Sequence, residues 1–487
     1  MSNFYVACEL GAKNGRVMLG SLHQGQLTMS EVRKFQNVPV KEDDSFQWNV
    51  PQLYQETVDG LREIGGFQEP IDSISCNSWA ADYLLFDSDG ALITPAYHHR
   101  DPVTESEMKK VFSKIPEQDI YDETGVHQTG VNTLFQLRAE KSRRLNKASH
   151  LMPVADGFNY LLGGGTPRAE TSLASLTQLY NPLAEAWSDR LFDALDLPRK
   201  LFPAVVRPGT EVGLLRPDIA KHTGLENVRV VTSCSHELAA ALAGLPKAAG
   251  ENWAFLRLGT WAVMGTELTR PIINEASRKL NFTNGIGCAG SVPFYKHMVG
   301  LWILEECQRF WAETERDLDG ALLVHLATSA TPFECLINPA DPRFLTPGDM
   351  PAKIQAFCKE TNQLVPRKPG QIVRCILESL ALLYRRTLRE IEALTGSQIN
   401  RLYLLADSGN SLLNHFIANA LQIPLVIAPA DATSIGNVMV QAVALGHIKS
   451  LDEARETVRH SFKMETIVPH ATAWNAAYER LAQHFPF

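Results

Sequence analysis

The same order of predicted elements occurs twice along this 487-residue sequence, and this repetition is the strongest constraint on its fold. The first half opens with apolar runs separated by glycine-containing turns, which indicate strands at residues 4–8, 16–22 and 27–35. The second half opens in the same way, with strands at 253–258 and 262–268. Each half then alternates helices and strands, a pattern that is typical of α/β domains.

Helical periodicity and short apolar runs define the other predicted elements. The helices are predicted at 51–64, 237–245, 300–313, 371–396, 412–421 and 435–445, and the strands at 71–76, 83–86, 228–232, near Phe282, at 402–405 and at 425–427. The sequence PKAAGE at 246–251 separates the two halves. We therefore expect two α/β domains with related plans, residues 1–247 and 248–487, and a ligand site in the cleft between them.

The composition favours a globular protein over a nucleic-acid or membrane binder. Hydrophobic residues make up 45% of the chain, charged residues 21%, and the formal net charge is −8 without a basic stripe. No run of about 18 apolar residues occurs, and the first ten residues, MSNFYVACEL, do not form a signal peptide. We expect a cytoplasmic protein with no nucleic-acid or membrane partner.

The cysteines do not form a recognisable short motif. They stand at positions 8, 76, 234, 288, 307, 335, 358 and 375. No pair has the two-residue spacing of a zinc or redox motif, and most lie in apolar runs such as YVACEL. The sequence therefore predicts buried free thiols, which fits a reducing compartment.

Several segments resemble the FGGY carbohydrate kinases, in order along nearly the whole chain. They include ELGAKNGRVMLG, WNVPQLY, SISCNSWAADYLLFDSDG, VTSCSHELAAALAGLP, LRLGTWAVMGTEL and ATSIGNVMVQAVALG, while INPADPRF and GLWILEE favour the rhamnulokinase branch. The resemblance implies an α/β fold of two actin-like, ribonuclease-H-like domains with the active-site cleft between them. It also implies a sugar-side domain at 1–247 and a nucleotide-side domain at 248–487. ATP and Mg²⁺ would be the cofactors, a small-molecule sugar the substrate, and the protein a monomer or homodimer.

The resemblance implies that the proton acceptor lies in the segment Ser235-His236-Glu237. In the family an Asp follows the His and accepts the proton of the sugar hydroxyl, and His236 would contact the sugar. Glu237 is a carboxylate of similar intrinsic pKa but one methylene longer, which displaces its oxygens by about an ångström unless the backbone compensates. The alternative for Glu237 is a carboxylate that stabilises a helix N-terminus.

The first hairpin matches a phosphate-binding turn of the family. Glu9 replaces the family's Asp and would be the Mg²⁺ ligand, and Lys13 and Asn14 replace serines. Gly11 and Arg16 are retained, so all five positions are candidate nucleotide contacts.

The second hairpin matches the other phosphate-binding turn. Gly259 and Thr260 are retained, but Arg257 and Leu258 replace two serines. Lys13 and Arg257 would grip a phosphate directly. The alternative for each is a structural or surface salt bridge.

The adenosine side of the site departs further from the family pattern. The segment LADSGN replaces a glycine-rich turn, with Asp407, Ser408 and Asn410 as the candidate contacts. Glu305 stands where the family has a nucleotide-contacting Gln. His297 stands where the family has an Asn near the ligand, and its alternative is a satisfied core histidine.

The sugar side keeps more of the family pattern. Asn77, Trp79, Ala80 and Asp82 stand where the family reads Asp, Trp, Gly and Asp. Trp79 would stack on a sugar face, and Asp82 would accept hydrogen bonds from sugar hydroxyls. The alternative for Trp79 is a buried core tryptophan.

Two further sugar-side candidates lie in the segment YHHRDPVT. Its Arg100 and Asp101 match a sugar-contacting pair of the family. The alternative for these two residues is a local ion pair.

The departures concentrate at nucleotide and transfer positions. Since an unpaired buried charge is costly, we expect Lys13 or Arg257 to pair with Glu9, Glu237 or Asp407 and to weaken ATP binding. Three functions follow from the resemblance. They are ATP-dependent phosphorylation of a ketose such as L-rhamnulose, with an impaired rate; non-catalytic binding of a sugar or sugar phosphate; and a kinase with an altered donor or acceptor.

Overall fold

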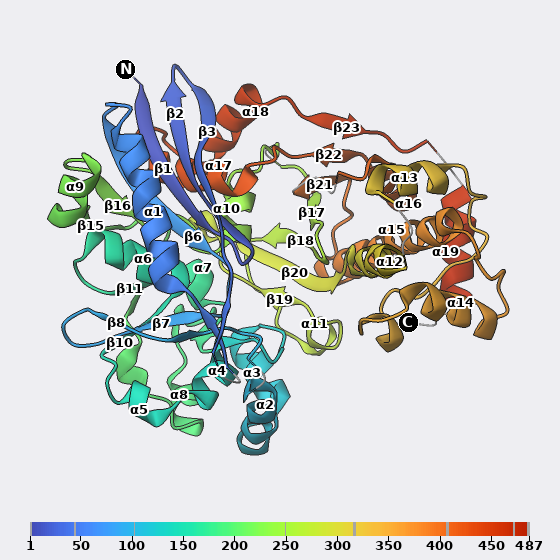
Figure 1. Ribbon diagram of the computed structural model, residues 1–487, viewed down its shortest axis with the longest axis horizontal. Helices are drawn as coiled ribbons and strands as arrows, with labels where there is room; N and C mark the ends of the chain where they lie inside the picture. Colours follow the sequence, from blue (N-terminus) through green and yellow to red (C-terminus); the bar gives the residue numbers. More distant parts are fainter. Residues whose placement is uncertain are drawn as a thin grey trace. The chain divides into compact units, whose positions relative to one another are not determined.

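The chain forms two compact units, each assembled from separate stretches of sequence (Figure 1). The computed structural model describes residues 2–42, 45–101, 103–248, 250–314, 318–405, 409–470 and 473–484. The first unit consists of Met1–Ala249, Leu268–Phe294 and Asp431–Lys463, and the second of Gly250–Glu267, Tyr295–Ala430 and Met464–Phe487. Within the described residues, no helix combines the length and the apolar character needed to cross a membrane.

The first unit is built on a sheet with the strand order β15-β16-β6-β1-β2-β3. Its elements are β1 (Asn3–Leu10), β2 (Asn14–His23), β3 (Gln26–Gln36), β4 (Val40–Glu42), β5 (Ser45–Trp48), α1 (Val50–Gly65), β6 (Ile71–Ser78), β7 (Tyr83–Phe86), β8 (Leu92–Ile93), β9 (Ala96–Tyr97), α2 (Val103–Lys114), α3 (Glu117–Thr124), α4 (Thr133–Ala139), α5 (Ser142–Leu145), β10 (His150–Pro153), α6 (Val154–Gly163), β11 (Arg168–Glu170), α7 (Thr171–Ala174), β12 (Tyr180–Asn181), β13 (Ala186–Trp187), α8 (Asp189–Ala194), η1 (Arg199–Leu201), β14 (Ala204–Val206), β15 (Glu211–Leu214), α9 (Pro217–Thr223), β16 (Arg229–Val231), α10 (Glu237–Ala243), α11 (Glu275–Lys279), β19 (Thr283–Asn284), η2 (Cys288–Gly290), α17 (Ala432–Ala444) and α18 (Leu451–Ser461). Tight turns make β1, β2 and β3 antiparallel neighbours, whereas β6 runs parallel to β1 and to β16.

Strand β1 is almost wholly apolar because helices cover both faces of its sheet. Side chains alternate between the two faces of a strand. Tyr5 and Ala7 accordingly pack in one core cluster with α17 and α18, and Val6 and Cys8 pack in another with α1 and α6. Figure 1 shows α17 and α18, in red, beside the blue strands β1–β3.

Helices α10 and α17 approach each other through glycines. A Cβ added at Gly436 would lie 1.8 Å from the carbonyl oxygen of Ala240, and one added at Gly244 would lie 2.6 Å from the backbone nitrogen of Gly436. Backbone therefore packs directly on backbone at this contact, and only glycine leaves the space for it.

Two buried carboxyl groups hold the segment that leads into α10. Ser235 Oγ donates to Asp156 Oδ1 at 2.6 Å, and the Ser235 backbone N–H donates to Glu170 Oε2 at 2.8 Å. The backbone N–H of Glu170 donates to Asp156 Oδ2 at 2.9 Å. Burial, and next the charge of Glu170, raise the pKa of Asp156 well above its ordinary value. Burial also raises the pKa of Glu170, against hydrogen bonds led by that from the Ser172 side chain.

The second unit contains the sheet order β20-β18-β17-β21-β22-β23. Its elements are β17 (Trp253–Arg257), β18 (Trp261–Leu268), β20 (Val292–Val299), α12 (Trp302–Glu313), α13 (Gly320–Thr328), η3 (Pro342–Phe344), α14 (Met350–Glu360), α15 (Pro369–Thr395), β21 (Arg401–Leu405), α16 (Ser411–Leu421), β22 (Leu425–Ile427), β23 (Glu465–Ile467) and α19 (Ala473–His484), with the ends of β18 and β20 falling in the first unit. β17 is antiparallel to β18 and parallel to β21, which repeats the arrangement of β1 with β2 and β6.

The structure confirms the predicted α/β fold class and most predicted elements. The expected strands at the start of each half are β1, β2, β3, β17 and β18, and the long helix expected at 371–396 is α15. Strand β20, which the sequence did not indicate, has the sequence VPFYKHMV, in which proline and lysine interrupt the apolar pattern. The helix expected at 435–445 is α17, and it belongs to the first unit.

The close contact of α10 and α17 yields a first prediction. Gly436→Ala places a methyl group against the Ala240 carbonyl, so we expect a loss of stability of about 3 kcal/mol, measured as a lowered Tm. Gly320→Ala, where the nearest heavy atom beyond the helix is Gln308 Nε2 at 3.8 Å, is the matched control and should leave Tm unchanged or slightly raised. Equal melting of the two variants would contradict the packing argument.

The buried carboxyl pair yields a second prediction. Because the folded-state pKa of Asp156 is raised, its contribution to stability is fully present below about pH 3.8 and is lost as the pH rises through that raised pKa. Asp156→Asn stays neutral at every pH, and its amide can donate to Ser235 Oγ while its oxygen accepts from Glu170 N–H. We expect the Tm of the variant minus that of the wild type to increase steadily with pH. Exposed Asp89→Asn is the control, and a pH-independent difference for Asp156→Asn would contradict the assignment.

Candidate active site

The Asp82 carboxylate is fully buried in the first unit, and its hydrogen bonds are gathered on one of its two oxygens. Asp82 Oδ2 accepts hydrogen bonds from Trp48 Nε1 at 2.8 Å, from Trp79 Nε1 at 2.6 Å and from the His99 ring at 2.7 Å. Its other oxygen, Oδ1, is buried and has no hydrogen-bond partner among the described residues. A buried acceptor without a donor is costly, so Oδ1 is suited to accept a hydroxyl from a ligand.

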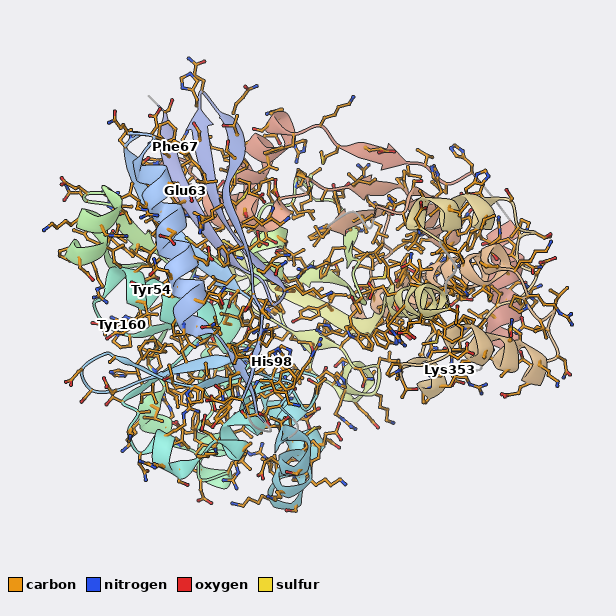
Figure 2. The ribbon with its side chains drawn as sticks, in the orientation of Figure 1. Tyr54, Glu63, Phe67, His98, Tyr160 and Lys353 are labelled. Carbon is orange, nitrogen blue, oxygen red and sulfur yellow. The ribbon has the colours of Figure 1, made fainter. Side chains whose placement is uncertain are left out.

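Aromatic rings surround this carboxylate. Trp48 stacks on His98 with the ring centroids 4.1 Å apart, and its centroid lies 4.4 Å from that of Trp79. Burial and then the neighbouring His99 lower the pKa of His98 to about 4, so its ring is neutral above that pH. Figure 2 labels His98 below α1 in the first unit. Trp48 and Trp79 both belong to a buried core cluster, which agrees with the alternative of a buried core tryptophan for Trp79.

The turn between Trp79 and Asp82 is held in a strained conformation. Ala81 has a φ of +86°, which residues other than glycine rarely adopt. Its carbonyl oxygen accepts hydrogen bonds from Thr133 Oγ1 at 2.6 Å and from Gln136 Nε2 at 3.2 Å. Two donors from α4 therefore fix the turn that places the carboxylate.

The sequence indicated only part of this group. Trp79 and Asp82 were predicted, but Trp48, His98 and His99 were not, although they lie in the quoted segments WNVPQLY and YHHRDPVT. The signal that was available is aromatic residues at the ends of short strands, since Trp48 is the last residue of β5 and His98 and His99 follow β9.

The other sugar-side candidates differ in exposure. Asn77 is fully buried, and its Oδ1 accepts from Asn437 Nδ2 at 2.9 Å. Ala80 is half-buried and Arg100 is exposed. Asp101 is buried, accepts from the Phe46 backbone N–H at 3.2 Å, and lines a cavity of about 550 Å³ together with His98. Ligand contact by these residues stays a prediction.

The predicted base lies beside the same strand end as the Asp82 turn. His236 precedes α10, Glu237 is the first residue of that helix, and both are half-buried. The backbone of Ser78, at the end of β6, donates to the Ser235 carbonyl at 2.8 Å. The His236 backbone N–H donates to Ser172 Oγ at 2.9 Å. The base segment and the sugar-side turn are therefore both anchored at the end of β6.

Glu9 pairs with a different cation from the one expected. The register of β1 and β2 places Glu9 directly opposite Arg16, and Glu9 Oε2 accepts from Arg16 at 2.6 Å and from Ser434 Oγ at 3.0 Å. Arg16 also binds Asp431 at 2.6 Å. Burial lowers the pKa of Arg16, but the two carboxylates outweigh burial and raise it. Cross-strand pairing decides the partner of Glu9. The prediction that Lys13 or Arg257 would pair with Glu9 did not take the register of β1 and β2 into account.

The tip of the first hairpin is open. The Gly11 backbone N–H donates to the Asn14 carbonyl at 2.9 Å, and a Cβ at Gly11 would lie 2.5 Å from the same oxygen. Lys13 and Asn14 are exposed, and Asn37 holds the turn by hydrogen bonds to Gly11 and Lys13 backbone oxygens.

Two nucleotide-side candidates contact each other in the second unit. Thr260 Oγ1 donates to Glu305 Oε1 at 3.1 Å. The Gly259 carbonyl accepts from the Leu301 backbone N–H at 2.8 Å, so the hairpin is fastened to the start of α12. Arg257 is half-buried at the end of β17.

The remaining nucleotide-side candidates are placed in part. Asn410 Oδ1 accepts from the Leu413 backbone N–H at 3.0 Å and so caps α16. His297 is exposed on β20, so the alternative of a core histidine is wrong. Asp407 and Ser408 lie outside the described residues.

Comparisons with known proteins agree over nearly the whole chain. The model of the FGGY family of carbohydrate kinases, N-terminal domain, matches residues 4–244, and the C-terminal domain model matches 254–445. A rhamnulokinase of Bacteroides thetaiotaomicron is 37% identical over 483 residues, with 98% of each chain covered. A rhamnulokinase of Enterococcus faecalis is 33% identical over 465 residues, covering 95% of this chain and 93% of its own length.

Solved structures share the fold at low sequence identity. A ligand-bound xylulose kinase from Lactobacillus acidophilus has a TM-score of 0.81 at 13% identity, covering 99% of this chain and 96% of its own. Plasmodium falciparum glycerol kinase with ADP has a TM-score of 0.81 at 12% identity, covering 100% and 98%. Together with the family models and the relatives above 30% identity, these matches show that the chain belongs to the FGGY family of carbohydrate kinases.

Proposed function

We propose that this protein phosphorylates a ketose of the L-rhamnulose type at the expense of ATP. The observation that carries the proposal is the buried Asp82, which offers one unsatisfied oxygen inside a group of aromatic rings. Such a group accepts a hydroxyl and covers an apolar ring face, as a sugar requires. The choice of ketose is supported by relatives named rhamnulokinase that match almost end to end.

The residues present fit Mg²⁺ and ATP, which the family uses. Arg16 and Ser434 occupy Oε2 of Glu9, and Oε1 has no hydrogen-bond partner among the described residues. That oxygen is a ligand of the kind Mg²⁺ takes beside water and phosphate. Ala12, Lys13 and Asn14 are exposed in the turn that follows Gly11, so the backbone of this turn is proposed to contact phosphate. Bound Mg-ATP supplies the phosphoryl group and neutralises its charge.

The chain itself supplies the proton acceptor and the sugar contacts. Glu237 is proposed to take the proton of the attacking hydroxyl, and hydrogen bonds to Glu170 and Ser172 fix the backbone of Ser235 and His236 that precedes it. Asp82 orients the sugar through its free oxygen, while Trp48 and Trp79 exclude water from that side.

The structure gives no support to a non-catalytic binding protein. Part of the case for that alternative was that Lys13 or Arg257 would pair with Glu9, Glu237 or Asp407 in the phosphate site. Glu9 has Arg16 as its partner, through ordinary cross-strand pairing, and the Lys13 side chain is exposed.

The proposed base is tested by Glu237→Gln. The amide cannot accept the proton, so we expect kcat for ATP-dependent phosphorylation of L-rhamnulose to fall by about 10²- to 10⁴-fold with Tm unchanged. Glu237→Asp keeps a carboxylate and should retain measurable activity. A coupled ADP-release assay over a panel of ketoses measures both the rate and the preferred sugar. Full activity of Glu237→Gln, or no turnover of any ketose by the wild type, would overturn the proposal.

The sugar contact is tested by Asp82→Asn. The amide oxygen can keep the tryptophan and histidine donors, but the group replacing Oδ1 no longer accepts a hydroxyl. We expect KM for the ketose to rise at least about tenfold while KM for ATP stays constant. Glu63→Gln, an acid-to-amide change on the exposed part of α1 (Figure 2), is the control. An unchanged KM for the ketose would remove Asp82 from the sugar site.

A further inference from the structure

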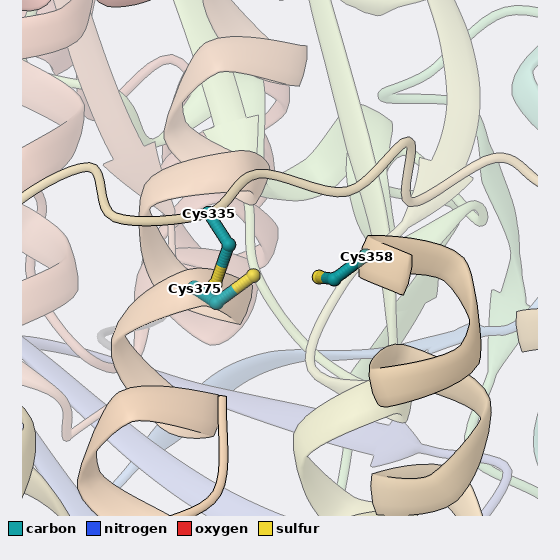
Figure 3. Close-up of side chains that lie close together, drawn as sticks. All are labelled: Cys335, Cys358 and Cys375. Carbon is teal, nitrogen blue, oxygen red and sulfur yellow. The ribbon is translucent and has the colours of Figure 1, made fainter. Parts of the chain in front are cut away.

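Three cysteines far apart in sequence converge in the second unit. Cys335 lies in the loop between α13 and η3, Cys358 on α14 and Cys375 on α15. Their sulfur atoms all lie within 4.8 Å of one another, and Figure 3 shows them pointing toward a common centre. The three residues are 3%, 0% and 2% exposed, and all are free thiols.

Hydrogen bonds fix the loop that carries Cys335. On one side of it, the Phe333 backbone N–H donates to Glu378 on α15 at 2.9 Å. On the other side, the Leu336 backbone N–H donates to Gln363 at 2.8 Å. The Ile337 backbone N–H donates to Ser379 on α15 at 2.9 Å. The loop is therefore fastened on both sides of the cysteine, to α15, which carries Cys375, and to Gln363, which follows α14.

The same contacts set the position of the two helices. Ser379 Oγ also donates to the Cys375 carbonyl at 2.6 Å, and the Gln363 backbone N–H donates to the Cys358 carbonyl at 2.8 Å. Hydrogen bonds to the backbone at or beside each cysteine therefore hold the three residues in place. No disulfide is needed to bring the sulfur atoms together.

Each thiol must lose its proton when it binds a metal ion, because the thiolate is the form of cysteine that binds metals.

We propose that Cys335, Cys358 and Cys375 bind one copper(I) ion through three sulfur ligands. Metal–thiolate bonds of about 2.3 Å place three sulfur atoms around one ion roughly 4 Å apart, which agrees with the spacing here. Soft thiolate ligands select soft cations. Structural zinc requires a fourth protein ligand, and among the described residues no His, Asp or Glu belongs to this group. The site is independent of the proposed phosphorylation.

The experiment titrates the fully reduced protein with copper(I) under anaerobic conditions against a chromophoric copper(I) chelator. We expect one ion per chain to be withdrawn from the chelator and Tm to rise, because the ion binds only the folded arrangement. Each single change Cys335→Ser, Cys358→Ser or Cys375→Ser should weaken binding at least about tenfold. Cys307→Ser, another buried cysteine of the second unit, is the matched control and should bind as the wild type does.

A spectroscopic measurement on the wild type tests the copper ligands even if a cysteine variant folds poorly. X-ray absorption at the copper edge of the loaded wild type should show sulfur neighbours alone, three in number, at about 2.3 Å. Failure of the reduced wild type to compete for copper(I) would overturn the proposal. Binding that persists in Cys335→Ser, or nitrogen and oxygen neighbours in the spectrum, would overturn it too. Zinc bound more tightly than copper(I) by the same cysteines would contradict the choice of metal.

Discussion

The end of strand β6 fixes the positions of both the Asp82 turn and the segment that carries the proposed base. β6 is hydrogen-bonded to β1 on one edge and to β16 on the other, and most of its residues are fully buried. Its last residue, Ser78, leads into the Asp82 turn on one side and binds the Ser235 segment on the other. A strand held in this way cannot shift in register, so the sugar-side carboxylate and the proposed base keep fixed positions on one scaffold.

The buried charges of the first unit are satisfied in different ways. Burial raises the pKa of Asp156 and so favours its neutral form, whereas Glu170 accepts several hydrogen bonds. Glu9 has a cation opposite it on the next strand. Asp82 collects three donors on one oxygen, and its other oxygen has no hydrogen-bond partner among the described residues. Other buried polar atoms of the first unit, such as Asn77 Nδ2 and Asn159 Nδ2, also lack a partner there, so it is the combination with a charge and three donors that distinguishes Asp82.

Sequence patterns predicted the helices and strands well but predicted the side-chain contacts between them poorly. The strands at 4–8 and 253–258 and the helix at 371–396 were predictable because each has a strong period or apolar run. The resemblance to the FGGY kinases supplied Asp82 and Glu237, but not His99, whose contact depends on a loop returning from another sheet. The partner of Glu9 required the register of β1 with β2, and the three-cysteine group required the packing of a loop on two helices. None of these distances in space can be read from spacing along the chain.

The discontinuous first unit has a consequence for biosynthesis. The residues that cover Tyr5 and Ala7 belong to α17 and α18, which end only at Ser461. A nascent chain emerging from the ribosome therefore carries one uncovered apolar sheet face until nearly all of the protein has been translated. The second unit can be complete except for its last strand and helix before the first unit closes. The first unit, whose synthesis begins first, thus cannot close until most of the second unit has been translated, and chaperone binding during translation should concentrate on the N-terminal strands.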